Sequence, residues 1–443
     1  AETNPMMKVD QVQQDVGSGG LGITGEDVTV CIVDSGLLFT EAIPPLLEYQ
    51  HKGKTFVHAA VFGSKKTMQK IKQADPNCKG NFGNLCHVSA GVVENGHGSA
   101  VTEIIASKIE YGPSVAPDVN LMMVRIDENT PTKGQLKKGL KYCFGNNKEG
   151  RKADVVYTGF AFLKNKNGTT NYALVRDDPL NGALKGKGNI KSIQKLVDYK
   201  ANALPGKINS DGSSPNFNPQ ISIFIAPAGN TYAAFECPTG SISCVPLNEL
   251  SQQLQDQKTG VNKLAAIPGT ISVGAVYDNN GVGENWPGEQ VYTPCFDSEN
   301  GALSRQAMCL TACENVLLDL VAPGYKITTH TTNNPLYLKA VRGTSAAAAN
   351  VAGVVALIKS QAAKNGFVIH VCEGNVPLQE CTPSHNKFKY SYIDINAFEI
   401  RNILENTGDT SVKGLGIGNY IPPDNCYGNW GLVDARAAVG EVS

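Results

Sequence analysis

Short apolar runs that alternate with longer helical patterns are the feature of this sequence that most constrains its fold. The runs are rich in Val and Ile and show little polar alternation, as expected for strands that are covered on both faces. The clearest predicted strands are Val28–Val33, Leu121–Ile126, Val155–Tyr157, Ile221–Ala226 and Ile271–Val276. The predicted helices are Ser99–Lys108, Lys133–Tyr142, Ser345–Ser360, Asn396–Glu405 and Val433–Val439. This alternation predicts an α/β fold, a doubly wound and mostly parallel sheet with helices on both faces.

Two long stretches interrupt the alternation, Glu48–Glu94 and Leu163–Gln220. Both are poor in pattern and rich in Lys, Asn, Gly and Asp, and loops of that length are usually functional or partly disordered insertions. Predicted strands of one sheet lie on either side of each stretch, and no repeat or low-complexity linker divides the chain. We therefore interpret residues 1–443 as a single domain with two long loop insertions.

The charge balance argues against binding to nucleic acid or to an anionic membrane surface. Lys and Arg together number 39, and Asp and Glu number 40, so the charges nearly cancel. The longest run of small and apolar residues, Ala346–Ile358, is too short to span a bilayer and contains Asn350. The chain begins at Ala1 without a basic or apolar leader, as a mature protein cut from a precursor would, although an engineered start would look the same.

Cysteine usage suggests an oxidising compartment. The chain has 12 cysteines, and several form close pairs in loop-like sequence. These pairs are Cys78 and Cys86, Cys237 and Cys244, Cys309 and Cys313, and Cys372 and Cys381. We expect a secreted protein in which such pairs close loops as disulfides, and the sequon at Asn167 agrees with a secreted glycoprotein. Cys31 is the expected exception, a free thiol packed in a buried strand.

A zinc site is the competing interpretation of part of this cysteine pattern. Its ligands would be His370, Cys372, Cys381 and His385. Their spacing fits no common zinc finger, so disulfides are the preferred interpretation.

Three polar residues stand where ligand sites form in α/β sheets. Asp34 directly follows a predicted strand, at the carboxyl end where such sites gather. His97 stands at the start of a predicted helix. Ser345 begins the most apolar helix, where free backbone N–H groups favour developing negative charge. Each residue alone could equally be an ordinary cap or turn residue.

Their joint occurrence indicates acyl transfer. That chemistry needs a nucleophile, a base, an acid that orients the base, and donors for the oxyanion. Asn230 ends an apolar strand between His97 and Ser345, and its side chain could donate to the oxyanion beside the Ser345 N–H. The order Asp, His, Ser differs from chymotrypsin-like and α/β-hydrolase triads, and no G-x-S-x-G elbow is present.

These segments resemble the signature motifs of the subtilisin-like serine peptidases, the subtilases. In chain order the motifs are Val-x-Val-x-Ile-Val-Asp-Ser-Gly around Asp34, Asn-Gly-His-Gly-Ser around His97, Ala-Gly-Asn at Asn230 and Gly-Thr-Ser-Ala-Ala around Ser345. The similarity extends from Val9 to Ala438, with insertions. It implies a subtilisin-like fold and a secreted endopeptidase whose triad is Asp34, His97 and Ser345, with Asn230 in the oxyanion hole.

The resemblance also implies the partners of the enzyme. Protein or peptide substrates are expected, together with an N-terminal propeptide in a zymogen precursor. Catalysis requires no cofactor and no metal in the site. Structural calcium is an open expectation without a location, because Ile43 stands where bacterial members carry a calcium-binding aspartate.

The substrate would bind as an added strand beside Gly159, Phe160, Ala161 and Phe162, opposite a low wall formed by Ala228 and Gly229. The two phenylalanines and the absence of a carboxylate favour a large apolar residue before the scissile bond. Asp127 and Glu128 suggest a weaker basic preference at an outer pocket.

Several residues depart from the family pattern without removing a catalytic atom. They are Ser99, Ala100 and Glu103 after the histidine, and Ala346, Ala348, Ala349 and Asn350 after the serine. The alanine-rich helix start therefore leaves a second hypothesis open, a catalytically silent relative that acts as a binding protein. An esterase or lipase is disfavoured by the missing elbow and the triad order.

Overall fold

The computed structural model describes the sheet, the helices that cover it and several short hairpins. The described residues are 3–14, 17, 19–36, 56–62, 69, 97–107, 114–126, 132–145, 152–160, 172–173, 193, 196–197, 222–227, 235–236, 245–246, 261–262, 264–265, 267, 269–278, 292–294, 296–297, 304–305, 319–324, 327–329, 339–341, 343–366, 368–372, 384, 388–393, 395, 397–409 and 431–443.

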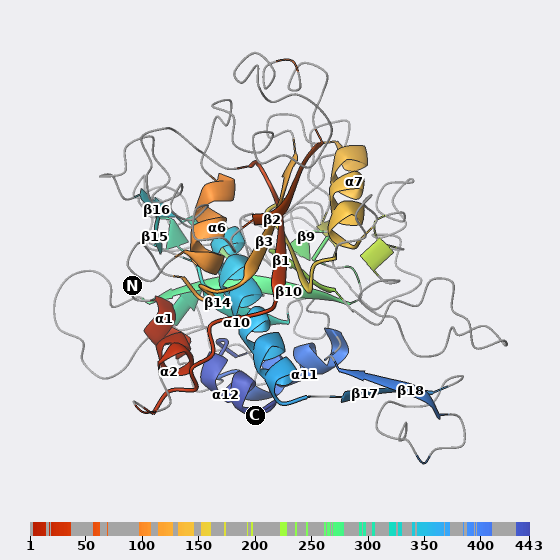
Figure 1. The fold of residues 1–443 in the computed structure, drawn as a ribbon. Coiled ribbons are helices and arrows are strands. Elements are labelled where there is room, and N and C mark those ends of the chain that lie inside the picture. Colours follow the sequence, from red (N-terminus) through yellow and green to blue (C-terminus); the bar gives the residue numbers. More distant parts are fainter. Residues whose placement is uncertain are drawn as a thin grey trace.

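One eight-stranded sheet forms the centre of the fold (Figure 1). Its strands are β1 (Thr29–Asp34), β2 (Phe56–Phe62), β3 (Asn120–Ile126), β4 (Val155–Thr158), β6 (Ile223–Pro227), β10 (Thr270–Asp278), β11 (Tyr292–Pro294) and β14 (Leu320–Pro323). The order is β11-β10-β6-β4-β1-β3-β2, and β14 also pairs with β10. All pairings are parallel except that of β11 with β10. The predicted mostly parallel sheet is confirmed.

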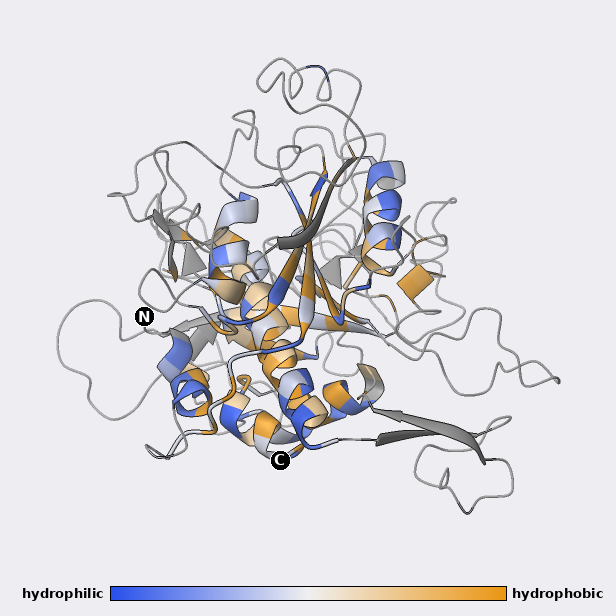
Figure 2. Ribbon diagram, in the orientation of Figure 1, coloured by the Kyte–Doolittle hydropathy of each residue, from blue (hydrophilic) through white to orange (hydrophobic). Residues whose placement is uncertain are grey.

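Helices cover both faces of this sheet. The longer ones are α6 (His97–Ala106), α7 (Lys133–Cys143), α10 (Thr344–Lys364) and α11 (Ala397–Thr407). Short helices lie near the two ends of the chain, α1 (Thr3–Met6), α2 (Val9–Gln13) and α12 (Ala435–Gly440). Helix α10 contacts α6 and strands β1, β4, β6, β10 and β14, whereas α7 contacts β1, β2 and β3. In Figure 2 the hydrophobic residues follow the central strands and α10, and hydrophilic residues lie on α7.

The remaining strands form two-stranded antiparallel units. They are β5 (Tyr172–Ala173) with β9 (Val261–Asn262), β7 (Phe235–Glu236) with β8 (Val245–Pro246), β12 (Phe296–Asp297) with β13 (Ser304–Arg305), β15 (Ile327–Thr329) with β16 (Lys339–Val341), and β17 (Val368–Cys372) with β18 (Phe388–Ile393).

Helix α10 is the core helix of the fold. It is longer than the predicted Ser345–Ser360 and continues to Lys364, where Gly366 adopts φ 64° just beyond the helix end. Of the described helices, it alone is long and apolar enough to cross a membrane, yet 89% of its apolar window is buried inside the protein. Its small residues allow close approach to the strands. Ala346, Ala348 and Ala349, which depart from the family pattern, are all buried here.

The structure departs from the sequence prediction at β2. The sequence predicts a loop insertion over Glu48–Glu94, but Phe56–Phe62 pairs with β3 and extends the central sheet at its edge. The segment is an apolar heptapeptide, Phe-Val-His-Ala-Ala-Val-Phe, whose pattern is short and is surrounded by polar sequence. The other predicted insertion, Leu163–Gln220, contributes only Tyr172 and Ala173, as β5, to the described strands.

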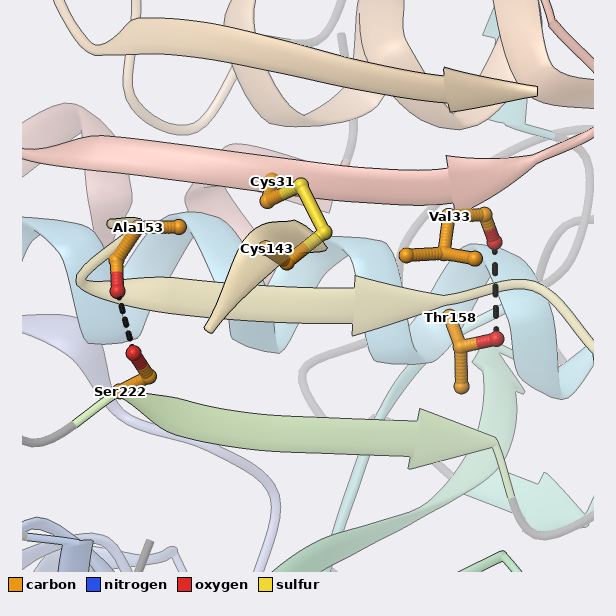
Figure 3. Close-up of a disulfide and its surroundings, with 6 residues drawn as sticks. All are labelled: Cys31, Val33, Cys143, Ala153, Thr158 and Ser222. Carbon is orange, nitrogen blue, oxygen red and sulfur yellow. Dashed lines mark hydrogen bonds between the residues drawn. A yellow bond between two sulfur atoms is a disulfide. The ribbon is translucent and has the colours of Figure 1, made fainter. Parts of the chain in front are cut away.

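A disulfide joins Cys31 of β1 to Cys143, the last residue of α7 (Figure 3). The prediction of a free Cys31 thiol was therefore wrong. The two Cα atoms lie 5.7 Å apart although 112 positions separate them in the sequence, so the pairing follows from packing α7 on β1. Of the loop cysteines, Cys78, Cys86, Cys237, Cys244, Cys309, Cys313 and Cys381 lie outside the described residues, as do His385 and the sequon Asn167.

Candidate active site

Asp34 is the last residue of β1 and lies at the carboxyl edge of the sheet. Asp34 as a whole is 2% exposed, and one carboxylate oxygen, Oδ1, accepts a hydrogen bond of 2.7 Å from the Ser35 N–H. The parallel order brings the carboxyl ends of β4 and β6 to the same edge. A buried carboxylate here needs further donors, because an uncompensated charge is costly away from water.

His97 supplies one such donor. It is the first residue of α6, and its Nδ1 lies 2.8 Å from Asp34 Oδ1 and 3.0 Å from Oδ2. An ionised carboxylate only accepts hydrogen bonds, so Nδ1 carries the proton, and in the neutral ring Nε2 is left as the acceptor. The imidazole side chain is 41% exposed and the carboxylate side chain 3%. A buried acid therefore orients a base that remains open to solvent.

Short loop contacts position α6 against the end of β1. The Gly98 N–H donates to Ser35 Oγ at 3.0 Å, and the Thr102 hydroxyl donates back to the Gly98 carbonyl at 2.7 Å. A Cβ on Gly98 would overlap the Gly36 carbonyl oxygen. Only glycine allows this approach of the helix to the strand end. The glycine that follows His97 is thus explained by packing.

Ser345 lies in the first turn of α10 and is 6% exposed. Gly343 caps the helix with φ 123°, and its N–H donates to the Gly324 carbonyl at 2.7 Å. Gly324 itself is closely packed, because a Cβ there would lie 2.6 Å from Ala275 Cβ and 2.8 Å from the Gly343 oxygen. Further along α10, Asn350 donates from Nδ2 to the Pro323 carbonyl at 2.8 Å. The end of β14 therefore supports the helix start at two points.

Tyr157 is a residue of this site that sequence reasoning missed. It lies in β4, is 0% exposed, and its hydroxyl donates to the Ser345 carbonyl oxygen at 3.1 Å. Burial, with a smaller effect of the negative charge on Asp34, raises the pKa of the phenol well above its usual value of about 10. The sequence did contain a signal for this role, because Tyr157 is a polar aromatic residue directly after two valines in a strand predicted to be buried.

Gly159 follows β4 and lies against the Asp34–His97 pair. Its N–H donates to the Val33 carbonyl at 3.1 Å. A Cβ on Gly159 would overlap Asp34 Oδ2 and lie 2.9 Å from His97 Cε1. The first residue of the segment predicted to bind substrate is therefore packed directly against the carboxylate–imidazole pair.

The structure describes only part of the predicted substrate and oxyanion residues. The Phe160 N–H donates to Thr158 Oγ1 at 3.2 Å, and its half-buried side chain packs against the hydrophobic core. The others lie outside the described residues, namely Ala161, Phe162, Ala228, Gly229 and Asn230, together with Ile43, Asp127 and Glu128. Within the described part of the chain, no group of three or more His, Cys, Asp or Glu side chains is arranged to hold a metal ion.

Comparisons with known proteins extend these observations. The model of the Subtilase family matches residues 25–407. One similar solved structure is the MycP3 protease from the type VII (ESX-3) secretion system, with 15% identity, coverage of 99% of this chain and 88% of that chain, and a TM-score of 0.49. The search among curated proteins gave no match.

Proposed function

Since the chain belongs to the subtilase family of serine peptidases, we propose that it is an endopeptidase that acts through a triad of Asp34, His97 and Ser345. The observation that carries the proposal is the bond from His97 Nδ1 to the buried Asp34 carboxylate, at 2.8 Å and 3.0 Å from its two oxygens. Because Nδ1 faces Asp34, Nε2 is the ring nitrogen that can accept a proton from a hydroxyl.

The proposed reaction proceeds through an acyl-enzyme. Ser345 Oγ attacks the carbonyl carbon of the peptide bond while His97 Nε2 takes the hydroxyl proton. Collapse of the tetrahedral intermediate breaks the C–N bond, and the imidazolium gives its proton to the leaving amine. Water then attacks the ester by the same route and regenerates the Ser345 hydroxyl. Asp34 holds the imidazole tautomer and stabilises the imidazolium throughout.

Oxyanion stabilisation is assigned to the Ser345 N–H and the Asn230 side chain, as the family motif implies. The Ser345 N–H lies in the first turn of α10, before the N–H groups that reach a carbonyl four residues earlier, and the helix dipole favours negative charge at this end. Replacing Asn230 with Ala should lower kcat by about 10²–10³ with little change in KM, a magnitude carried over from subtilisin.

The test of the nucleophile is covalent labelling. A fluorophosphonate should label the protein once, at Ser345, and Ser345→Ala should lose both labelling and peptide cleavage while keeping the native circular dichroism spectrum. Ser360→Ala is a matched control, because this serine lies in the same helix and donates to the Glu26 carbonyl at 3.0 Å. It should be labelled as efficiently as the wild type. Stoichiometric labelling of another serine would reject the assignment.

Activity also separates the peptidase from the alternative of a catalytically silent binding protein. The peptidase should cleave an unstructured protein such as casein, and cleavage should disappear in Ser345→Ala. A wild-type protein that binds casein and never cleaves it, at any protein concentration, would favour the silent relative.

For substrate preference, we infer that a large apolar residue precedes the scissile bond. Support comes from Gly159 and Phe160, which bring an apolar segment without a carboxylate to the catalytic edge. Peptides that vary only at this position should show kcat/KM about tenfold to a hundredfold higher for Leu, Phe, Tyr or Met than for Ala. A Lys or Arg peptide cleaved faster than both Leu and Phe would contradict this preference.

Secretion with a propeptide is part of the same proposal. The disulfide between Cys31 and Cys143 supports folding in an oxidising compartment, where such bonds persist. Expression of a precursor that carries a leader and a propeptide should release an active peptidase, shorter than the precursor, into the medium.

A further inference from the structure

The hydroxyl of Tyr157 forms a hydrogen bond with the peptide group of Ser345. The donor is fully buried in the middle of the sheet, and the acceptor oxygen lies 3.1 Å away in the first turn of α10. The two residues are 188 positions apart in the sequence. Phenylalanine would fill the same space with the same ring, so the hydroxyl is the part of this side chain that requires an explanation.

Strand register places this tyrosine directly beneath the catalytic edge. Tyr157 pairs with Ile32 of β1 and with Ile225 of β6. Side chains alternate between the two faces of a sheet. Asp34 comes two residues after Ile32, and Gly159 comes two residues after Tyr157, so both lie on the same face as Tyr157. The opposite face carries Cys31, which is bonded to α7. The phenol therefore lies between the Asp34 end of β1 and the start of α10.

The Tyr157 phenol is expected to stay protonated and so to remain a hydrogen-bond donor to Ser345. Burial first, and the negative charge on Asp34 second, raise the pKa of the phenol well above its usual value. The hydroxyl consequently keeps its proton throughout the pH range in which a neutral imidazole acts as a base. The hydroxyl can therefore donate to the Ser345 carbonyl throughout that range.

We propose that Tyr157 is a positioning residue for peptide hydrolysis. Its hydroxyl holds the peptide group of Ser345 in place for attack with the help of the Asp34–His97 pair. The inference rests on the proposed function, in which Ser345 is the nucleophile. Strand β4 then serves both halves of the site. Gly159 contacts the acid and the base, and Tyr157 fixes the residue that attacks. Small displacements of an attacking atom reduce rates strongly, so one hydrogen bond at this point affects catalysis.

The experiment compares Tyr157→Phe with Ser222→Ala. Ser222 is the matched control, because its buried hydroxyl also donates to a backbone carbonyl, that of Ala153 at 2.6 Å, beside the opposite end of β4 (Figure 3). Both variants lose one buried side-chain hydrogen bond to the main chain. For each, we measure kcat and KM on a peptide substrate, the rate constant of inactivation by a fluorophosphonate, and the melting temperature. The rate constants are measured well below the melting temperature of each variant, so that partial unfolding does not alter them.

Tyr157→Phe should lower kcat and the inactivation rate constant together, by about fivefold to tenfold, with KM changed less than about twofold. The two variants should lower the melting temperature by similar amounts, but Ser222→Ala should leave kcat and the inactivation rate constant at the wild-type values. Rate constants of Tyr157→Phe equal to those of the wild type would make the hydrogen bond purely structural and overturn the inference. Wild-type labelling at a serine other than Ser345 would overturn the proposed function as well, so the two failures are distinguishable.

Discussion

Single residues at the catalytic edge are constrained by contact distances. Gly159 has no room for a side chain, because a Cβ would overlap Asp34 Oδ2 and press on His97 Cε1. Gly159→Ala must therefore displace the carboxylate–imidazole pair, and displacement of a base by about 1 Å costs about a hundredfold in rate. We expect kcat/KM to fall by about that factor, measured on a peptide substrate.

Gly134→Ala is the control for this substitution. Gly134 lies in the first turn of α7, and an added Cβ there would meet only Thr132 Oγ1, at 3.9 Å. Alanine in this helix should leave kcat/KM unchanged and stabilise the protein by about 0.4–1 kcal/mol. A Gly159→Ala enzyme within threefold of the wild type would show that the site tolerates a side chain at this contact.

Tyr157 also predicts how stability depends on pH. Because its pKa is raised in the folded state, the folded protein retains the phenolic proton more strongly than the unfolded chain does. This contribution to stability is fully present below about pH 10, the unfolded value, and is lost as pH rises from there toward the folded pKa. The slope is at most about 1.4 kcal/mol per pH unit.

Tyr157→Phe removes this titration. Urea unfolding between about pH 9 and about pH 11 should show a smaller loss of stability with pH for the variant than for the wild type. Curves that run parallel for the two proteins would mean that Tyr157 ionises equally easily in the folded and unfolded states.

At the scale of elements, the disulfide fixes α7 to the strand that carries Asp34. Cys31 lies three residues before Asp34 in β1, and the bridge closes a loop spanning 112 positions. In the chain-entropy account, such a long loop gives a large stabilisation, and removal of a native disulfide costs about 2–5 kcal/mol. The double variant Cys31→Ala, Cys143→Ala should lose that amount in the free energy of unfolding, measured in guanidinium chloride.

The single variant Cys143→Ala, which leaves Cys31 as a buried thiol, serves as the comparison. It should lose about as much stability as the double variant, because the bridge rather than either sulfur carries the effect. A loss below about 1 kcal/mol in both variants would show that the contacts of α7 with β1, β2 and β3 suffice without the bridge.

At the scale of the whole molecule, the amino-terminal segment packs against the carboxyl-terminal helix α12. The Ala435 N–H donates to the Met7 carbonyl at 2.8 Å, and helix α2 contacts α12 (Figure 1). Met7 is fully buried, whereas the neighbouring Lys8 pairs with Asp434 through a side chain that is 41% exposed. Burial should therefore contribute more to this contact than the ion pair does.

Met7→Ala should lower the free energy of unfolding by about 2–5 kcal/mol, and Lys8→Ala by no more than about 1 kcal/mol. Urea unfolding of the two variants measures both values under identical conditions. A larger loss for Lys8→Ala than for Met7→Ala would show that the ion pair, and not the apolar contact, joins the two ends.

Local patterns in the sequence predicted most of the central architecture. The five predicted strands correspond to β1, β3, β4, β6 and β10, because buried parallel strands require uninterrupted apolar runs. Strand β2 escaped this reasoning, since a short apolar run inside a polar stretch is equally compatible with a loop. Its strand character comes from pairing with β3, which is a property of the neighbouring strand.

By itself, the sequence determined the family, the parallel α/β class, and the placement of Asp34 at a strand end and of His97 and Ser345 at helix starts. These properties follow from short motifs and local periodicity, so they are present in neighbouring residues. Only the tertiary structure decided that Cys31 pairs with Cys143 and that Tyr157 holds the Ser345 peptide. Both contacts join segments more than a hundred positions apart, and they exist because packing across the sheet brings those segments together.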